Sequence, residues 1–268
     1  MNTPPSLADA LGDYLALRRA LGFKIAAAGR LLGQFVDYLS EHGDGMPTTD
    51  DALAWANLPA GASANWRAIR LSVVRGFASY LHSLDATVDV PSADLVRHGP
   101  DRATPYLYSD AELRRLLGAA GELRPGFRAA TYQTLIGLLA TCGLRVSEAI
   151  ALNTTDLDRD ERLLVIRETK FAKSRLVPLH PTTMARLAAY LTLRDQTHAY
   201  PRCAALLISG AGTRLHHSNV SLTFAPLAAR VGIVRRSAAC RPRLHDLRHS
   251  FAVATVLDCT ALARTCRR

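Results

Sequence analysis

The chain has 268 residues, enough for one or two domains, and its 49% hydrophobic content can supply packed cores. Its formal net charge of +10 favours a polyanionic partner, and the charge is uneven: residues 1–96 carry a net −3 and residues 97–268 a net +13. The five Cys residues lack CxxC spacing, which argues against a disulfide framework. The N-terminus lacks a signal-peptide pattern, and no apolar run approaches membrane-spanning length. Together these features predict a cytoplasmic chain and argue against a membrane protein.

The first part of the chain has the pattern of successive amphipathic helices. Apolar residues recur at helical spacing over residues 7–21 and 31–39, and a longer helix is expected over residues 62–83. The residues expected on the buried face of this longer helix are Ile69, Val73, Phe77 and Leu81. Arg67 and Arg75 lie off that face, so they are candidate contacts to a DNA backbone or, equally well, solvated surface side chains.

The helical pattern stops where Gly and Pro residues accumulate and the local charge turns positive. We place an interdomain linker there, over residues 97–106, between an N-terminal helical domain (1–96) and a second domain (107–268). Ser109 and Glu112 stand at the spacing of a capping box, which predicts that a helix opens the second domain.

The second domain combines helices with a short run of strands. A helix over residues 125–142 is expected to end at Gly143 and to deliver Arg145 from the following turn. Two apolar runs, 163–166 and 176–179, predict an antiparallel hairpin. Further helices are expected over residues 181–195 and 218–231 and around His245. The fold class is therefore mostly α (α+β) with a small antiparallel sheet.

Several residues of this domain suit phosphoryl-transfer chemistry. Cleaving a phosphodiester builds negative charge on the nonbridging oxygens, and Arg145 and Arg248 can clamp them with charge-assisted hydrogen bonds. Lys170, on the hairpin, can give a proton to the leaving 5′ oxygen, and His245 can handle the proton of the nucleophile. Glu148, one turn after Arg145, is expected to orient a guanidinium.

Three ordered motifs carry a family resemblance. Residues 142–148 read Cys-Gly-Leu-Arg-Val-Ser-Glu, residues 169–179 read Thr-Lys-Phe-Ala-Lys-Ser-Arg-Leu-Val-Pro-Leu, and residues 245–252 read His-Asp-Leu-Arg-His-Ser-Phe-Ala. They resemble the tyrosine recombinase (phage integrase) family over residues 107–257. The resemblance implies a SAM-like, four-helix core-binding domain before the catalytic domain, double-stranded DNA as partner, a homo-tetramer on DNA, and neither cofactor nor metal.

Carried over by position, the resemblance implies Arg145 and Arg248 as the phosphate clamp, Lys170 as general acid and His245 as the first active-site His. The family's hairpin usually reads Gly-Lys-Gly, and the neighbours of Lys170 differ from this, which leaves Lys173 as an alternative. The other candidates are His249 as a supporting residue and, as DNA contacts, Lys173, Arg175, Arg241 and Arg243.

The resemblance also predicts what is missing. Family members continue with a His or Trp element and a Tyr that forms a phosphotyrosyl link to DNA, whereas no Tyr follows Tyr200 here. We expect a C-terminally truncated site-specific recombinase or integrase of a mobile element, without a nucleophile, that binds DNA and does not cleave it alone. Residues 259–267, back-translated with a chosen set of GC-rich codons and one inserted base, give Trp-Tyr-Arg-Ala-Gly-Ala-Asp-Val-Gln, which resembles the family's next loop and predicts a frameshift.

Two alternatives stay open. In the first, the chain is a noncatalytic DNA-binding remnant of a recombinase. An assay for a covalent protein–DNA adduct distinguishes such a remnant from an active recombinase. In the second it is a metallohydrolase, because His245 and His249 have the i, i+4 spacing of two metal ligands. That reading needs a third ligand from Cys240 or His216, and it leaves the two arginines unexplained.

Overall fold

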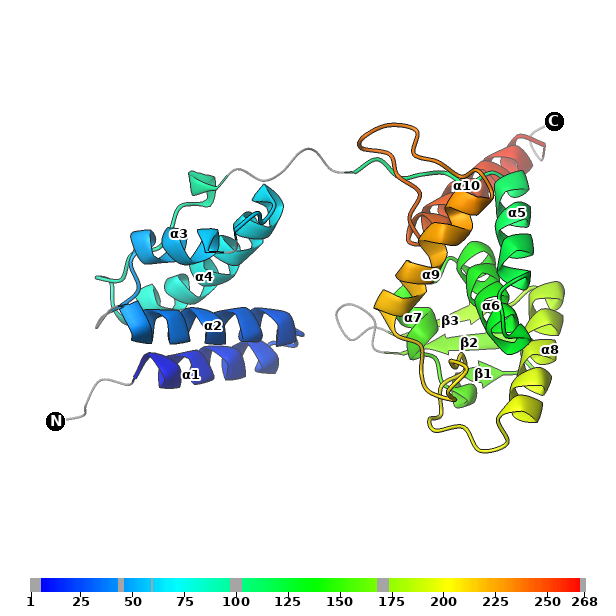
Figure 1. The fold of residues 1–268 in the computed structure, drawn as a ribbon, viewed down its shortest axis with the longest axis horizontal. Helices are drawn as coiled ribbons and strands as arrows, with labels where there is room; N and C mark the ends of the chain where they lie inside the picture. Colours follow the sequence, from blue (N-terminus) through cyan, green and yellow to red (C-terminus); the bar gives the residue numbers. More distant parts are fainter. Residues whose placement is uncertain (1–5, 43–45, 59, 97–102, 168–173, 266–268) are drawn as a thin grey trace. The chain divides into compact units, whose positions relative to one another are not determined.

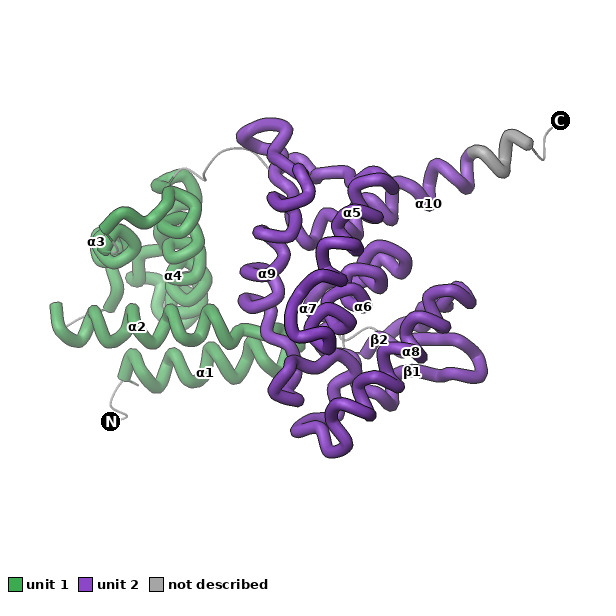
Figure 2. Tube along the Cα trace, turned by 45° about the vertical axis from the view of Figure 1, so that its right-hand side comes forward, with its two compact units in different colours: residues 1–101 green, residues 102–268 purple. Residues whose placement is uncertain are grey.

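The computed structural model describes residues 6–42, 46–58, 60–96, 103–167 and 174–265, with side chains described as far as residue 260. The chain divides into two compact units, residues 1–101 and residues 102–268 (Figure 2). The described residues form a mostly helical protein with a small antiparallel sheet, which confirms the predicted fold class.

Four α-helices make up most of the first unit: α1 (Leu7–Ala20), α2 (Ala26–His42), α3 (Thr49–Asn57) and α4 (Ala64–Leu84). Local signals set their starts. Ser6 caps α1 and Thr48 caps α3, each in a capping box with the Asp three residues later. A short 3-10 helix, Ala93–Leu95, follows α4.

The buried face of α4 differs from the expected one. Phe77 and Leu81 are buried as predicted, but Ile69 is 42% exposed and Arg70 is buried in its place. Arg70 has a specific partner: it lies over the ring of Trp55 and donates to the Trp55 carbonyl oxygen, so a charged side chain occupies a buried position of the helix. Arg67 and Arg75 are both half-buried.

The second unit is built around one helix. Its elements are α5 (Asp110–Gly121), α6 (Gly126–Cys142), α7 (Val146–Ala151), the 3-10 helix Thr154–Asp156, β1 (Leu157–Asp158), β2 (Leu163–Ile166), β3 (Arg175–Pro178), α8 (Pro181–Thr197), α9 (His217–Arg230) and α10 (Asp246–Thr265). Helix α6 packs against α5, α8 and α10, and Figure 1 shows it inside this group. Because α6 is apolar around most of its circumference, it forms the centre of the core.

The sheet has the order β1-β2-β3 and is antiparallel throughout. In its longer pair, Leu163 lies opposite Pro178 and Ile166 lies opposite Arg175. Leu164 and Ile166 point into the core, so the opposite face of β2 is the more exposed one. The segment between β2 and β3, with the predicted Lys170 and Lys173, lies outside the described residues.

Candidate functional site

The turn after α6 places the first predicted arginine. Gly143 ends the helix in the left-handed region, with φ of 58°, and a Cβ there would overlap the ring of Phe251 from α10. Glycine therefore permits both the turn and the close packing of α10. Arg145 follows in an extended conformation as the N-cap of α7.

Glu148, in the first turn of α7, is the centre of an arginine cluster. It is buried, and its Oε2 accepts from the backbone N of Arg145 at 2.8 Å while its Oε1 accepts from Nη1 of Arg145 at 2.7 Å. Arg175, the first residue of β3, binds the same carboxylate with both ends of its fork, at 3.1 Å to Oε1 and 2.7 Å to Oε2. The carboxylate thus joins α7 to the sheet.

Arg248 reaches the same cluster from α10. Its Nη1 donates to the carbonyl oxygen of Gly143 and lies 3.8 Å from Oε2 of Glu148. Arg145 and Arg248, distant in the sequence, are therefore brought together around one acid, which is what a phosphate clamp requires. Their side chains are 42% and 32% exposed, so both remain accessible to a ligand.

The electrostatics of the cluster follow from its composition. Burial alone would raise the pKa of Glu148, but hydrogen bonds from Arg175 and Arg145 outweigh it and lower that pKa to about 2. Burial, and then the charge of Arg145, lower the pKa of Arg248. Three guanidinium groups around one carboxylate leave a local positive excess, which favours an anionic ligand.

The start of α10 places the predicted histidines beside this cluster. His245 is exposed, and its ring lies 4.9 Å from that of the half-buried His249 in an edge-to-face arrangement. Partial desolvation lowers the pKa of His245, and the charge of His249 acts in the same direction. A neutral imidazole of this kind can accept a proton near neutral pH.

Asp246 anchors the beginning of α10. Its carboxylate is fully buried and accepts from the backbone N, Nε and Nη2 of Arg243 at 3.0–3.1 Å. Arg241, in contrast, is exposed, and its Nε donates to the carbonyl oxygen of Ala238 at 3.4 Å. Of these two predicted DNA contacts, Arg241 thus has the more available guanidinium, and Arg243 is held against an acid.

The sequence did not indicate the partner of Arg175. We expected a DNA contact there, and the structure shows a bidentate ion pair with Glu148, 27 residues earlier. A similar contact was missed at Arg236, which lies over the ring of Tyr106 at 4.2 Å and 3.8 Å from Glu112. Both partners are distant in sequence, so no local pattern could have revealed them.

The tyrosine packed beneath the start of α10 is Tyr108. Its hydroxyl donates to the carbonyl oxygen of Arg243, its backbone N donates to Ser250, and burial followed by the charge of Asp246 raises its pKa well above the ordinary value. A phenol held in this way is a poor nucleophile because its ionised form is disfavoured.

The described residues offer no group of three or more His, Cys, Asp or Glu side chains placed to hold a metal ion. Of the proposed third ligands, the Cys240 thiol lies 3.8 Å from the carbonyl oxygen of Pro105, and His216 is the residue that precedes α9. Among the helices that the structure describes, none is long and apolar enough to cross a membrane.

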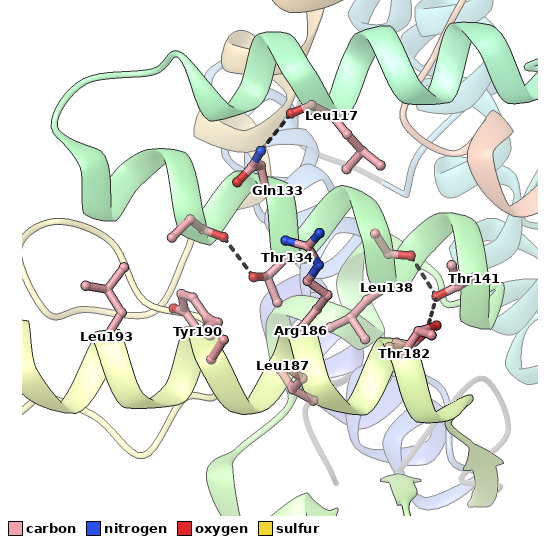
Figure 3. A pocket seen from close by; sticks show the side chains of 14 residues that line it. Leu117, Gln133, Thr134, Leu138, Thr141, Thr182, Arg186, Leu187, Tyr190 and Leu193 are labelled. Carbon is pink, nitrogen blue, oxygen red and sulfur yellow. Dashed lines mark hydrogen bonds between the residues drawn. The ribbon is translucent and has the colours of Figure 1, made fainter.

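A cavity of about 490 Å³ lies between α6 and α8, away from the arginine cluster (Figure 3). Leu138, Leu187 and Tyr190 line it, and its polar residues are partly used by the helices themselves: Thr134 donates to Ala130, and Gln133 donates to Leu117. None of the predicted site residues lines this cavity.

Known proteins similar to this chain are integrases and recombinases, and the similarity covers most of the chain. The family model described as the phage integrase family matches residues 107–256. A putative integrase/recombinase y4rB of Sinorhizobium fredii is 41% identical over 93% of this chain and 81% of its own length. The tyrosine recombinase XerD of Rhizobium meliloti is 32% identical over 80% of this chain and 70% of its own.

Solved structures agree in fold. The XerH site-specific recombinase bound to its difH substrate has a TM-score of 0.63, with 18% identity over 90% of this chain and 72% of that one. The Tn1549 transposon integrase in complex with circular intermediate DNA has a TM-score of 0.62, with 16% identity over 90% of this chain and 84% of that one. With the family model and the close relatives, the chain belongs to the phage integrase family of tyrosine recombinases.

Proposed function

We propose that this protein binds duplex DNA and that Arg145 and Arg248 hold the phosphate at which a recombinase of this family exchanges strands. The observation that carries the proposal is the convergence of these two arginines on Glu148. Their guanidinium groups are half-exposed and each is fixed at one end by a protein acceptor. The remaining donors can therefore bind nonbridging oxygens without a large entropic cost.

In the proposed chemistry, the arginines stabilise the charge that grows on the nonbridging oxygens as the phosphodiester bond breaks. His245 accepts the proton of the attacking hydroxyl, for which its lowered pKa keeps the ring neutral. Lys170, outside the described residues, would give a proton to the leaving 5′ oxygen. The nucleophile that relatives supply as a tyrosine is not Tyr108, because its hydroxyl is committed to the backbone.

The proposed partner follows from the charge of the second unit and from the relatives: XerH and the Tn1549 integrase were both solved with DNA. Assembly into a tetramer on DNA, a role in a mobile element, and the expected truncation, frameshift and inability to cleave all remain predictions. The DNA contacts predicted for Arg67, Arg75, Lys173, Arg241 and Arg243 also remain predictions.

The test is duplex binding as a function of salt concentration. Replacing Arg145 and Arg248 together by Ala should lower affinity and reduce the slope of log K against log salt by about 0.9 for each phosphate that the variant no longer neutralises. Arg186→Ala is the matched control, because Arg186 is an exposed arginine of α8 outside the cluster. If the double variant behaves like this control, the phosphate clamp is refuted.

A further inference from the structure

The carboxylate of Glu148 is fully occupied by four donors. Oε1 accepts from Nη1 of Arg145 and Nη1 of Arg175, and Oε2 accepts from the backbone N of Arg145 and Nη2 of Arg175. A carboxylate has about four lone-pair positions for hydrogen bonds. Arg175 thus fills half of the capacity, and its fork uses both oxygens at once.

This occupancy explains the position of Arg248. Its Nη1 lies 3.8 Å from Oε2 of Glu148, too far for a hydrogen bond, and donates instead to the carbonyl oxygen of Gly143. If the two hydrogen-bond positions that Arg175 fills on Glu148 were open, we would expect the nearby guanidinium of Arg248 to bind the carboxylate. A hydrogen bond to a charged acceptor is stronger than one to a neutral carbonyl. Arg248 would then have fewer donors free for a phosphate.

We propose that Arg175 is a positioning residue that saturates Glu148 and thereby keeps Arg145 and Arg248 available to a DNA phosphate. This inference rests on the proposed function of the same arginine pair and assigns Arg175 a role different from direct DNA contact. Its own fork is turned to the acid, whereas the other two guanidinium groups contact Glu148 at one end only. The geometry calls for an arginine here, because a lysine ammonium cannot bridge both carboxylate oxygens in the same way.

The chain offers a matched control on the neighbouring strand. Arg167 follows β2 and pairs with the buried Asp156 at 2.8 Å, just as Arg175 begins β3 and pairs with the buried Glu148. Both arginines therefore tie the same strand pair to a buried acid. Only Arg175 touches the cluster with Arg145 and Arg248.

The experiment compares Arg175→Lys with Arg167→Lys, two variants that keep the charge. In the full chain without DNA, the Nε–Hε resonance of Arg248, assigned with Arg248→Lys, should shift in Arg175→Lys and not in Arg167→Lys. Titration with inorganic phosphate should then show affinity about tenfold weaker in Arg175→Lys alone, the scale of one charged hydrogen bond. Thermal unfolding of each variant reports whether the fold is kept.

The possible outcomes separate the two proposals. If Arg175→Lys keeps both the Arg248 resonance and the phosphate affinity of the parent, the positioning role is wrong and Arg175 contributes charge only. A loss of affinity with an unchanged Arg248 resonance also overturns it, because that result points to direct contact of Arg175 with the anion. If Arg145→Ala and Arg248→Ala leave phosphate affinity unchanged, the proposed phosphate clamp is wrong.

Discussion

In the first unit, the buried Arg70 pairs with an aromatic residue: its guanidinium lies 3.5 Å from the centre of the Trp55 ring, and its Nη2 donates to the Trp55 carbonyl oxygen at 2.8 Å. In the second unit the arrangement is reversed, since the acids Glu148 and Asp246 are buried and the arginines around them are half-exposed. Arg70 therefore lies inside a core, whereas the arginines that surround these two acids stay partly exposed.

The difference shows how the partner of an arginine decides whether its guanidinium stays exposed. A ring and a carbonyl hold Arg70 inside the core, and burial lowers its pKa. The buried carboxylate of Glu148 instead offsets its own desolvation through several donors: it takes both ends of the Arg175 fork and one end of Arg145.

The largest expected effect is removal of the central acid. Glu148→Ala should destabilise the second unit by about 3–5 kcal/mol, because it leaves partly buried guanidinium groups facing one another without a counter-charge. Both tryptophans, Trp55 and Trp66, belong to the first unit, so tryptophan fluorescence follows that unit alone. Urea unfolding should show the loss by amide circular dichroism while the fluorescence transition stays in place. A shift of both transitions would mean that the units do not unfold independently.

The acid should also make the second unit sensitive to pH. The pKa of Glu148 is about 2 when folded against an ordinary 4.5, so its contribution is full above pH 4.5 and is lost as the pH falls towards 2. A shift of this size corresponds to about 3 kcal/mol. Urea unfolding at pH 5 and pH 3 should show a smaller difference in Glu148→Gln than in the parent. An equal difference would place the acid sensitivity in other carboxylates.

A substitution of Arg70 tests whether the buried arginine of the first unit has a structural role only. Arg70→Met keeps the packing stem and removes the charge, so it should cost about 2 kcal/mol from the buried hydrogen bond and the ring contact. The fluorescence transition should move and the salt slope of DNA binding should not, since this guanidinium faces the core. A reduced salt slope would show that Arg70 contacts phosphate and would remove the contrast between the units.

Local signals predicted much of this fold. The end of α6 at Gly143 and the start of α5 at Ser109 were readable because glycine in the left-handed region and a capping box act over a few residues. Arg145 and Arg248 were found through motifs, and the structure places them together. What sequence could not give is long-range pairing: Arg175 with Glu148 depends on how β3 packs beside α7. Arg70 was missed because periodicity assigns charged residues to the surface.

The smallest effect is expected at an ion pair of the same unit that lies on its surface. Arg230 and Glu122 are in close contact, yet their side chains are 55% and 61% exposed. Water screens such a pair and the long side chains lose freedom on forming it, so Arg230→Ala should change the free energy of unfolding by about 0.5 kcal/mol or less. Burial of the acid, and not the closeness of the charges, would then account for the contrast with Glu148. If urea unfolding instead shows that Arg230→Ala costs as much as Glu148→Ala, contact distance is what sets the energy, and the buried acids lose the special role given to them here.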